Sequence, residues 1–365
     1  MRYDPKLNCR IGQIVRCHPV PIIPNKTHYA EKLSELGENP LSNINGPSVL
    51  RVPEWITDRL GKYYLYFSHH KGTSIRLAYA DHMAGPWFIH KKPVLTLEKS
   101  LFVTEDLDPN SSSDWVNGPE YLYAHVASPD VHVDHHAKQI LMFFHGLLPN
   151  GDQQTRLAVS ENGRSFSAKP PLLGPSYLRA FQWRGRWYTT HLWGDMGMLE
   201  TLSNAPKILP HGTLPLQITC APHSKIRHGH ICQVGEQIHF VFSRVGDTPE
   251  CILHCRIELS DDPQDWRFGP VTTLLKPDET WEGFGREPVK SSEGSAPGWI
   301  PELRDPCLFY DEGQLWLLYS GGGERGIGVA QVIDYCAPFA FNKSSNHALT
   351  SVVFSPSFGA LDDGA

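Results

Sequence analysis

The chain has 365 residues, 40% of them hydrophobic, and a formal net charge of −6 at pH 7. A chain of this length can bury a large core. Its basic residues are scattered singly, which excludes nucleic acid and an anionic membrane surface as the main partner. The first residues are charged and no apolar run reaches the length of a bilayer, so we expect a cytoplasmic protein. The oligomeric state is left open.

Two short strands separated by a tight turn recur five times along the chain. The second strand of each pair is rich in aromatic residues and ends in a polar residue. A third strand follows in each repeat, least clearly at 197–201. First strands are expected at 48–52, 130–133, 177–183, 230–234 and 306–310, and second strands at 63–69, 140–145, 186–191, 238–244 and 314–320.

A strand unit repeated five times at intervals of tens of residues is typical of a β-propeller. We therefore predict an all-β fold, a five-bladed β-propeller in which the first strand of each blade borders an axial pocket. Residues 41–338 would form the propeller, residues 1–40 an N-terminal arm that can close the ring, and residues 339–365 a C-terminal tail. Two long polar loops, 98–119 and 282–301, would hang over one face and wall the pocket.

Several segments resemble the five-bladed propeller glycoside hydrolases, a group that includes family 43, the invertase-like enzymes and family 117. The resemblance covers about residues 40–335. It implies the same fold, action on a glycosidic bond, and three acidic groups at the starts of the inner strands. The segments that carry it are Asn45-Gly46-Pro47-Ser48, the strands that follow Gly61, Ser128-Pro129-Asp130-Val131, Leu303-Arg304-Asp305-Pro306 and the strands that follow Tyr310.

The chain departs from this family pattern in its first blade. Where the resemblance implies a general-base Asp before Pro-Ser, the chain has Asn45 and Gly46. Neither residue can take a proton from water. The usual catalytic base is therefore missing or has moved to another blade.

Two Asp residues are candidates for the catalytic acids that remain. Asp130 directly precedes an inner strand, although a turn-forming Asp bound to its own backbone is the alternative. Asp305 lies in an Arg-Asp-Pro segment that resembles the sugar-gripping element of invertase-like enzymes, and Arg304 could hold it ionised. For Asp305 the alternative is an ion pair that locks two blades.

The general acid is expected at one end of the second long loop. Glu282 follows Trp281, which could shield the carboxyl and raise its pKa, and Glu302 precedes the Arg-Asp-Pro segment. Glu120 is a weaker candidate, and an exposed surface Glu is the alternative for each of them.

The densest local cluster is Arg227-His228-Gly229-His230. His228 could act as acid or base near pH 7 and replace the missing Asp. His228 and His230 could also bind a structural cation on the axis, although no third ligand is evident. We favour acid–base chemistry or substrate contact, and no cofactor is required.

Polar residues at inner-strand starts and second-strand ends are expected to bind the substrate. A single His at a strand end is usually structural, but the same position holds His or Arg in four blades, at His69, His145, His191 and Arg244. The full predicted set is Asn45, His69, His132, His145, Tyr177, Arg179, His191, Arg227, His230, Arg244 and Arg304.

These residues predict a glycoside hydrolase that acts on an oligosaccharide or glycoside, exo-acting and inverting. Inversion through an activated water requires the acid and the base to stand about 6.5 to 9.5 Å apart. Two alternatives remain open. One is a lyase or isomerase of an acidic sugar, in which His or Tyr177 removes a proton and Arg groups neutralise the carboxylate. The other is a sugar-binding propeller without catalysis.

Overall fold

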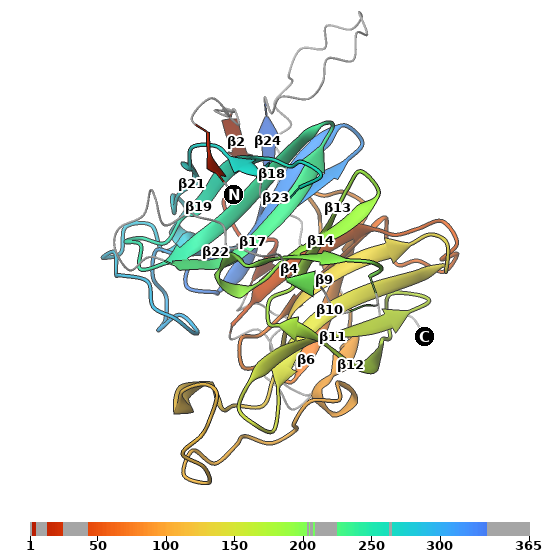
Figure 1. Cartoon of the computed structure of the whole chain (residues 1–365). Helices are drawn as coiled ribbons and strands as arrows, with labels where there is room; N and C mark the ends of the chain where they lie inside the picture. The colour runs from red at the N-terminus through yellow and green to blue at the C-terminus, as the bar shows by residue number, and fades with distance from the viewer. Residues whose placement is uncertain are drawn as a thin grey trace, which may run out of the picture.

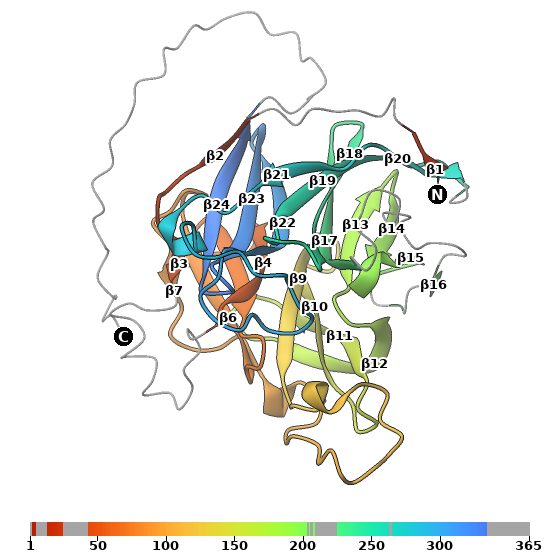
Figure 2. The ribbon, with the colours of Figure 1, turned by 90° about the vertical axis from the view of Figure 1, so that its left-hand side faces the viewer.

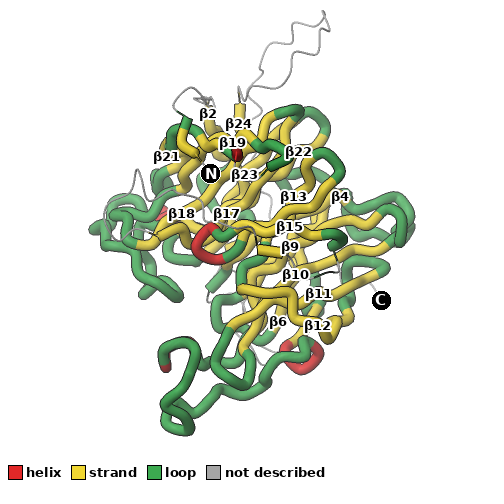
Figure 3. Tube along the Cα trace, viewed as in Figure 1, coloured by secondary structure: helices red, strands yellow, loops and turns green. Residues whose placement is uncertain are grey.

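The computed structural model describes residues 2–4, 13–24, 43–202, 204, 207–208, 225–262 and 265–333. Strands dominate this part of the chain, as Figure 3 shows. Its helices are 3-10 turns, and none of the helices described is long and apolar enough to cross a membrane. They include η1 (Leu97–Lys99), η2 (Pro119–Tyr121), η3 (Leu192–Gly194) and η6 (Thr280–Glu282).

The strands form five separate sheets that follow one another along the chain and are arranged as blades around an axis, which Figure 1 shows from one side. The first blade consists of β4 (Asn45–Arg51), β5 (Tyr63–Ser68), β6 (Ser74–Ala80), β7 (Phe88–Ile89) and β8 (Leu95–Thr96). The second consists of β9 (Val126–Asp134), β10 (Gln139–Leu147), β11 (Gln153–Ser160) and β12 (Ser167–Pro175). The third consists of β13 (Arg179–Trp183), β14 (Arg186–Thr190), β15 (Met196–Leu199) and β16 (Lys207–Ile208).

The fourth blade consists of β17 (Lys225–Val234), β18 (Gln237–Val245), β19 (Ile252–Glu258), β20 (Arg267–Phe268) and β21 (Thr272–Leu275). The fifth begins with β22 (Leu303–Asp311), β23 (Gln314–Gly321) and β24 (Gly326–Ile333). Within each blade the first three strands pair antiparallel in chain order, as the repeats predicted. The prediction of an all-β, five-bladed propeller is confirmed.

The N-terminal segment adds strands to the last two blades. β2 (Gln13–Arg16) pairs antiparallel with one half of β24, and β3 (Ile23–Pro24) pairs with the other half. β1 (Arg2–Tyr3) lies parallel to β20 at the edge of the fourth blade. β2 and β3 therefore cover the outer edge of the fifth blade. The predicted tail, 339–365, lies outside the described residues.

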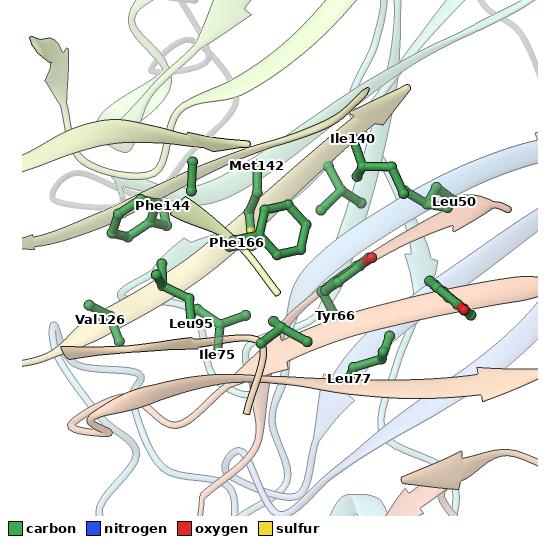
Figure 4. Close-up of a cluster of buried hydrophobic side chains, with 14 of the residues drawn as sticks. Leu50, Tyr66, Ile75, Leu77, Leu95, Val126, Ile140, Met142, Phe144 and Phe166 are labelled. Atoms are coloured by element: carbon green, nitrogen blue, oxygen red, sulfur yellow. The ribbon is translucent and has the colours of Figure 1, made fainter. Parts of the chain in front are cut away.

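The hydrophobic core is divided among the seams between blades. The described residues form five buried clusters, and each cluster joins two neighbouring blades. Figure 4 shows the seam between the first two blades, where Tyr66 and Leu77 of one sheet face Met142 and Phe144 of the next. Because the seams bury the apolar side chains, the axis is left to the edges of the inner strands and to polar residues.

Four inner strands are interrupted by a two-residue bulge near their start, where the pairing register shifts. In three of these strands the first bulge residue has a left-handed backbone and precedes Pro: Gly46 (φ 59°), Ser128 (φ 51°) and Asp305 (φ 50°). In the fourth strand the bulge is Arg227-His228. Bulges re-aim side chains and are frequent beside functional sites. Those in this ring bring equivalent positions of four blades to one end of the axis.

Polar side chains also join the blades around the axis. The inner strand of each blade is a sheet edge, so its backbone N–H groups on the axial side lack a strand partner. At four of the five junctions between blades in the described residues, a side chain of the preceding blade accepts a hydrogen bond from one of these N–H groups. The donors and acceptors are Val131 N to Ser48 Oγ (3.0 Å), Ala180 N to Asp130 Oδ2 (2.8 Å), Leu308 N to His230 Nδ1 (3.3 Å) and Gly46 N to Asp305 Oδ2 (3.2 Å).

Candidate active site

A row of buried and half-buried rings lies at the bulged end of the axis. The ring centroids follow one another from Tyr123 to His125 (4.7 Å), from His125 to His145 (5.3 Å), from His145 to Tyr177 (4.4 Å) and from Tyr177 to His228 (3.9 Å). His145 and His228 lie in strands of the second and fourth blades, and the other three rings lie in the segments that lead into the second and third blades. Tyr177 has a φ of 58°, which is unusual for a bulky residue and marks a position held by its surroundings.

His228 and Asp305 form the pair at the end of this row. Nδ1 of His228 contacts Oδ1 of Asp305, while Nε2 of His228 has no hydrogen-bond partner among the described residues. Burial lowers the pKa of His228 well below its usual value, and the charges of Arg227 and Arg179 lower it further. His228 is therefore neutral at pH 7. Its Nδ1–H donates to Asp305, and its Nε2 lone pair can accept a proton.

A second buried group combines the charged residues of the last two blades. Arg227 Nε donates to Glu250 Oε1 (2.9 Å), and Arg304 contacts both Glu250 Oε2 (3.3 Å) and Glu302 Oε2 (2.5 Å). Burial raises the pKa of Glu302 to about 7, although Arg304 opposes this shift. Glu302 is thus a carboxyl group that keeps its proton close to neutral pH and can donate it.

Glu324 connects these two groups to the first blade. Its Oε1 accepts a bond from Asn45 Nδ2 (3.1 Å) and lies 3.5 Å from His70 Nδ1, while its Oε2 lies 3.7 Å from Arg304 Nη1. Burial would raise the pKa of Glu324, but His70 and Arg304 hold it well below its usual range. The carboxylate is therefore ionised.

Sequence reasoning missed Glu324, and it also missed Glu250, Tyr123 and His125. A signal for the two Glu residues was present in the repeat itself. Each lies two residues before the third strand of its blade, at the hairpin that returns from the polar end of the second strand. Tyr123 and His125 lie in the segment before β9, for which the strand repeat carries no information.

Asp130 lies outside the bulge, because it follows Pro129 where Asp305 precedes Pro306. Its carboxylate accepts bonds from the Ala180 N–H (2.8 Å) and from Arg179 Nη1 (3.3 Å), and it lies 2.7 Å from His132 Nε2. Burial would raise its pKa, but His132 and Arg179 hold the pKa well below its usual range. In this position the carboxylate joins the second blade to the third.

An axial cavity of about 590 Å³ is bordered by the inner strands of all five blades. Of the predicted site residues, only Asp130, His132 and His230 line it. It extends along the later halves of the inner strands, away from the bulges. The predicted residues Asn45, His145, Tyr177, Arg227, His228, Arg304 and Asp305 gather instead at the bulged end.

Glu282 is held away from both groups. Its two oxygens accept bonds from Arg16 (2.8 Å each), and Oε1 also accepts one from Tyr319 (2.7 Å). The backbone N–H groups of Asp278 and Glu279 donate to it as well. The carboxylate thus fixes β2 and η6 to the fifth blade. Glu120, the weaker candidate, is exposed.

The repeated strand-end positions do not meet. Of the four, His145 alone belongs to the row of rings. The other three are bound within their own blades: His69 by the Lys71 N–H (3.0 Å), His191 by Thr189 Oγ1 (2.9 Å) and Arg244 by Asp247 Oδ2 (2.9 Å). A shift of one residue at a strand end changes the face on which a side chain lies. In the first blade that shift makes His70, not His69, the neighbour of Glu324.

Metal ligands of the usual kind are not assembled: no three His, Cys, Asp or Glu side chains within the described ranges converge as a metal site requires. His228 and His230, the pair considered for a cation, contact Asp305 and the Leu308 N–H respectively.

Comparison with known proteins gives one relative in sequence and several in structure. No family model matches the chain. It is 31% identical over 310 residues to "Uncharacterized protein R118" of Acanthamoeba polyphaga mimivirus. The matched region covers 80% of this chain and 83% of that protein.

The structural matches are to glycoside hydrolases at low identity. A thermostable family-43 glycoside hydrolase has a TM-score of 0.53 at 13% identity, over 79% of this chain and 89% of its own. A family-43 β-xylosidase/α-arabinofuranosidase from a compost metagenome has a TM-score of 0.51 at 14% identity. The match covers 86% of this chain and 95% of that enzyme. A family-43 enzyme of Xanthomonas citri in complex with xylotriose has the same TM-score and identity, over 87% and 96%. The resemblance to the propeller glycoside hydrolases is thereby confirmed for the fold.

Proposed function

Since the chain belongs to the same family as the uncharacterized mimivirus protein R118, whose name states no activity, we propose its function from its own site: a glycoside hydrolase that acts on an oligosaccharide. The family-43 fold of the structural neighbours supports this proposal, as does the binding of xylotriose by two of them. The observation that carries it is the buried His228–Asp305 pair with its unpartnered Nε2.

In the proposed reaction, His228 Nε2 takes a proton from the attacking water. Asp305 holds the imidazole in the required tautomer and stabilises the imidazolium that forms. Glu302 gives its proton to the glycosidic oxygen as the bond to the sugar breaks. The charge of Glu324 would stabilise the positive sugar ring of the transition state. Attack by water in one displacement inverts the anomeric configuration.

The surroundings of the pair suit a sugar end. Asn45, His145 and Tyr177 present polar groups near it, and the planar rings can pack against a pyranose face. The second long loop reaches η2, which follows the first long loop, beside this end of the axis: the Tyr121 hydroxyl donates to Glu293 Oε2 (3.3 Å). Closure on one side favours exo-action at a chain end.

The proposal is tested by incubating the protein with a panel of neutral oligosaccharides, with reducing-end release and the anomer of the first product read by NMR. His228→Gln is compared with His239→Gln, which removes a buried imidazole of the same blade that contacts His254 (3.2 Å) and lies outside the site. We expect release of the inverted anomer by the wild type and by His239→Gln, and none by His228→Gln. Turnover by a folded His228→Gln variant would refute the assignment.

One observation favours elimination on an acidic sugar as a second candidate. Tyr177 packs on His228 at 3.9 Å, and three buried guanidinium groups lie nearby, those of Arg179, Arg227 and Arg304. In that reaction His228 would remove the proton beside the carboxylate, and the Arg groups would stabilise the enolate while the glycosidic oxygen leaves. Incubation with uronate-containing oligosaccharides distinguishes elimination from hydrolysis, because only elimination forms an unsaturated product that absorbs in the ultraviolet. Saturable sugar binding without any product would indicate a binding protein.

A further inference from the structure

The loop between β21 and β22 contains a short segment held at both ends. At one end, the Ser291 N–H donates to Asp247 O (2.9 Å) and Ser291 O accepts from the Gly246 N–H (3.1 Å). At the other end, the Trp299 ring lies 3.7 Å from the guanidinium of Arg286. Residues 292–298 lie between these anchors. In Figure 2 the sky-blue loop that contains them crosses in front of the inner strands, at the centre of the ring.

The inner side of residues 292–298 contacts the site. Arg227 donates to Ser292 O and to Gly294 O (3.2 Å), and Arg304 Nη1 also donates to Gly294 O (3.1 Å). The Ala296 N–H donates to Glu324 Oε2 (3.1 Å). These bonds are made by backbone groups, which are the kind of partners that sugar hydroxyls could replace. They also explain the burial of Arg304 and Glu324, each only 1% exposed.

The outer side of the segment is held by one side chain. Glu293 accepts from Tyr121 OH (3.3 Å) and from Lys225 Nζ (3.0 Å). Tyr121 belongs to η2, in the segment that leads to the second blade, so this contact joins the loop of the last blades to the loop before the second. The side chains of Lys225 and Glu293 are 57% and 38% exposed. Exposed ion pairs of this kind are weak and sensitive to salt.

Two glycines shape the segment and the turn on which it rests. Gly294 has a φ of 77°, in the left-handed region that favours glycine. A Cβ at this position would meet no atom within 4 Å, so the space around it is open. Gly323 of the facing turn has a φ of 70°, and a Cβ there would strike the carbonyl of Gly298. Glycine at position 323 therefore allows the segment to settle against the fifth blade. This is a role for the Gly321-Gly322-Gly323 turn that its sequence alone did not reveal.

We propose that residues 292–298 are a lid over the site, and that Glu293 is the latch that decides which substrates enter. With the latch closed, the Nε2 of His228 is shut off from solvent. Opening the lid frees the donors of Arg227 and Arg304 and the oxygen of Glu324 for a sugar. The part of the inference that concerns substrates rests on the proposed function, and the movement of the lid does not.

Two variants, Glu293→Gln and Tyr121→Phe, test the latch, with Glu287→Gln as the matched control on an exposed residue of the same loop. Diethyl pyrocarbonate modifies unprotonated imidazole, and peptide mapping reports its rate at His228. We expect that rate to rise about two- to fivefold in both latch variants, the range that loss of an exposed ion pair gives, and to stay unchanged in Glu287→Gln. Hydrogen exchange at the Ala296 amide should rise in parallel. High salt should accelerate the wild type more than Glu293→Gln.

Substrate length gives the second measurement. An open lid admits longer or branched oligosaccharides, so Glu293→Gln should raise kcat/KM for these substrates relative to a disaccharide, mainly through a lower KM. Unchanged modification and exchange in both latch variants would overturn the lid. Faster modification and exchange without turnover of any substrate would leave the lid standing and refute the hydrolase. Turnover with an unchanged length preference would refute the role of Glu293 as a selector.

Discussion

Asp305 holds in the fifth blade the bulge position that Gly46 holds in the first, and the Gly46 N–H donates to Asp305 Oδ2 across the junction (3.2 Å). The resemblance to propeller glycoside hydrolases implies a carboxylate in the first blade at this level, where the chain has none. The bulge of the neighbouring blade supplies one within hydrogen-bond reach of the same backbone. The other oxygen of that carboxylate holds His228.

Replacing Asp305 by Asn should abolish most of the activity. An amide cannot stabilise an imidazolium and allows the wrong tautomer of His228, so we expect kcat to fall by about 10²- to 10⁴-fold. Rates are measured on the best substrate of the panel, with the fold checked by circular dichroism. The control is Asp134→Asn, since Asp134 only accepts turn N–H bonds from His136 and Ala137. Equal rates for the two variants would exclude the dyad.

Glu302→Gln should remove the basic limb of the pH–rate profile. The pKa of Glu302 is raised to about 7, so the proton that it donates is lost as the pH rises through that value. We expect kcat/KM of the wild type to fall above about pH 7, and the variant to be slow without this limb. A wild-type profile that stays flat through this range would contradict the assignment of Glu302 as the acid.

The same group should make stability depend on pH. The pKa of Glu302 is raised from 4.5 to about 7 on folding, so its stabilising contribution is complete below pH 4.5 and is lost as the pH rises through 7. Relative to Glu302→Gln, the free energy of unfolding of the wild type should fall by up to ~3 kcal/mol over this window. Urea denaturation at several pH values measures it. Parallel curves for the two proteins would show that Glu302 is not buried as a protonated acid.

Asp130→Asn should weaken the fold more than the chemistry. Breaking a buried ion pair leaves Arg179 uncompensated, so we expect a loss of about 3 kcal/mol in the free energy of unfolding, with kcat of the folded protein retained. Asp311→Asn is the matched control, because its partner Arg51 is 46% exposed and the pair should contribute less than about 1 kcal/mol. Lost turnover at unchanged stability would instead support the catalytic role that the sequence predicted for Asp130.

Arg16→Met should detach β2 from the last blade. Glu282 would then be a buried carboxylate without its cation, at a cost of about 3 to 5 kcal/mol in the free energy of unfolding. Limited proteolysis should also cut the chain sooner near residues 13–16. Arg51→Met removes an exposed cation and serves as the control. Similar stability and protease resistance of the two variants would show that the Arg16–Glu282 pair does not hold the strand.

Much of the candidate site could be predicted from sequence position. His228, Asp305, Arg304, Arg227, Asn45 and Tyr177 all lie at inner-strand starts, and all of them gather at the bulged end. Two of the predicted residues lie away from this end because of their register, by one residue for His69 and by two for Asp130. His70 replaces His69 beside Glu324, and Asp130 follows its Pro where Asp305 precedes it. The shift places Asp130 beside the axial cavity, where it accepts a bond from the third blade, and not among the residues of the bulged end.

The strands, their order and the five-bladed ring follow from the sequence, because aromatic strand patterns and Gly turns are local properties that a repeat makes plain. It also named both members of the His228–Asp305 pair. The fold alone shows that these two residues meet, that Glu250 and Glu324 pair with the neighbouring arginines, and that residues 292–298 contact the same arginines. Those contacts link blades that are far apart in the chain, and they depend on bulge geometry and burial, which no local pattern records.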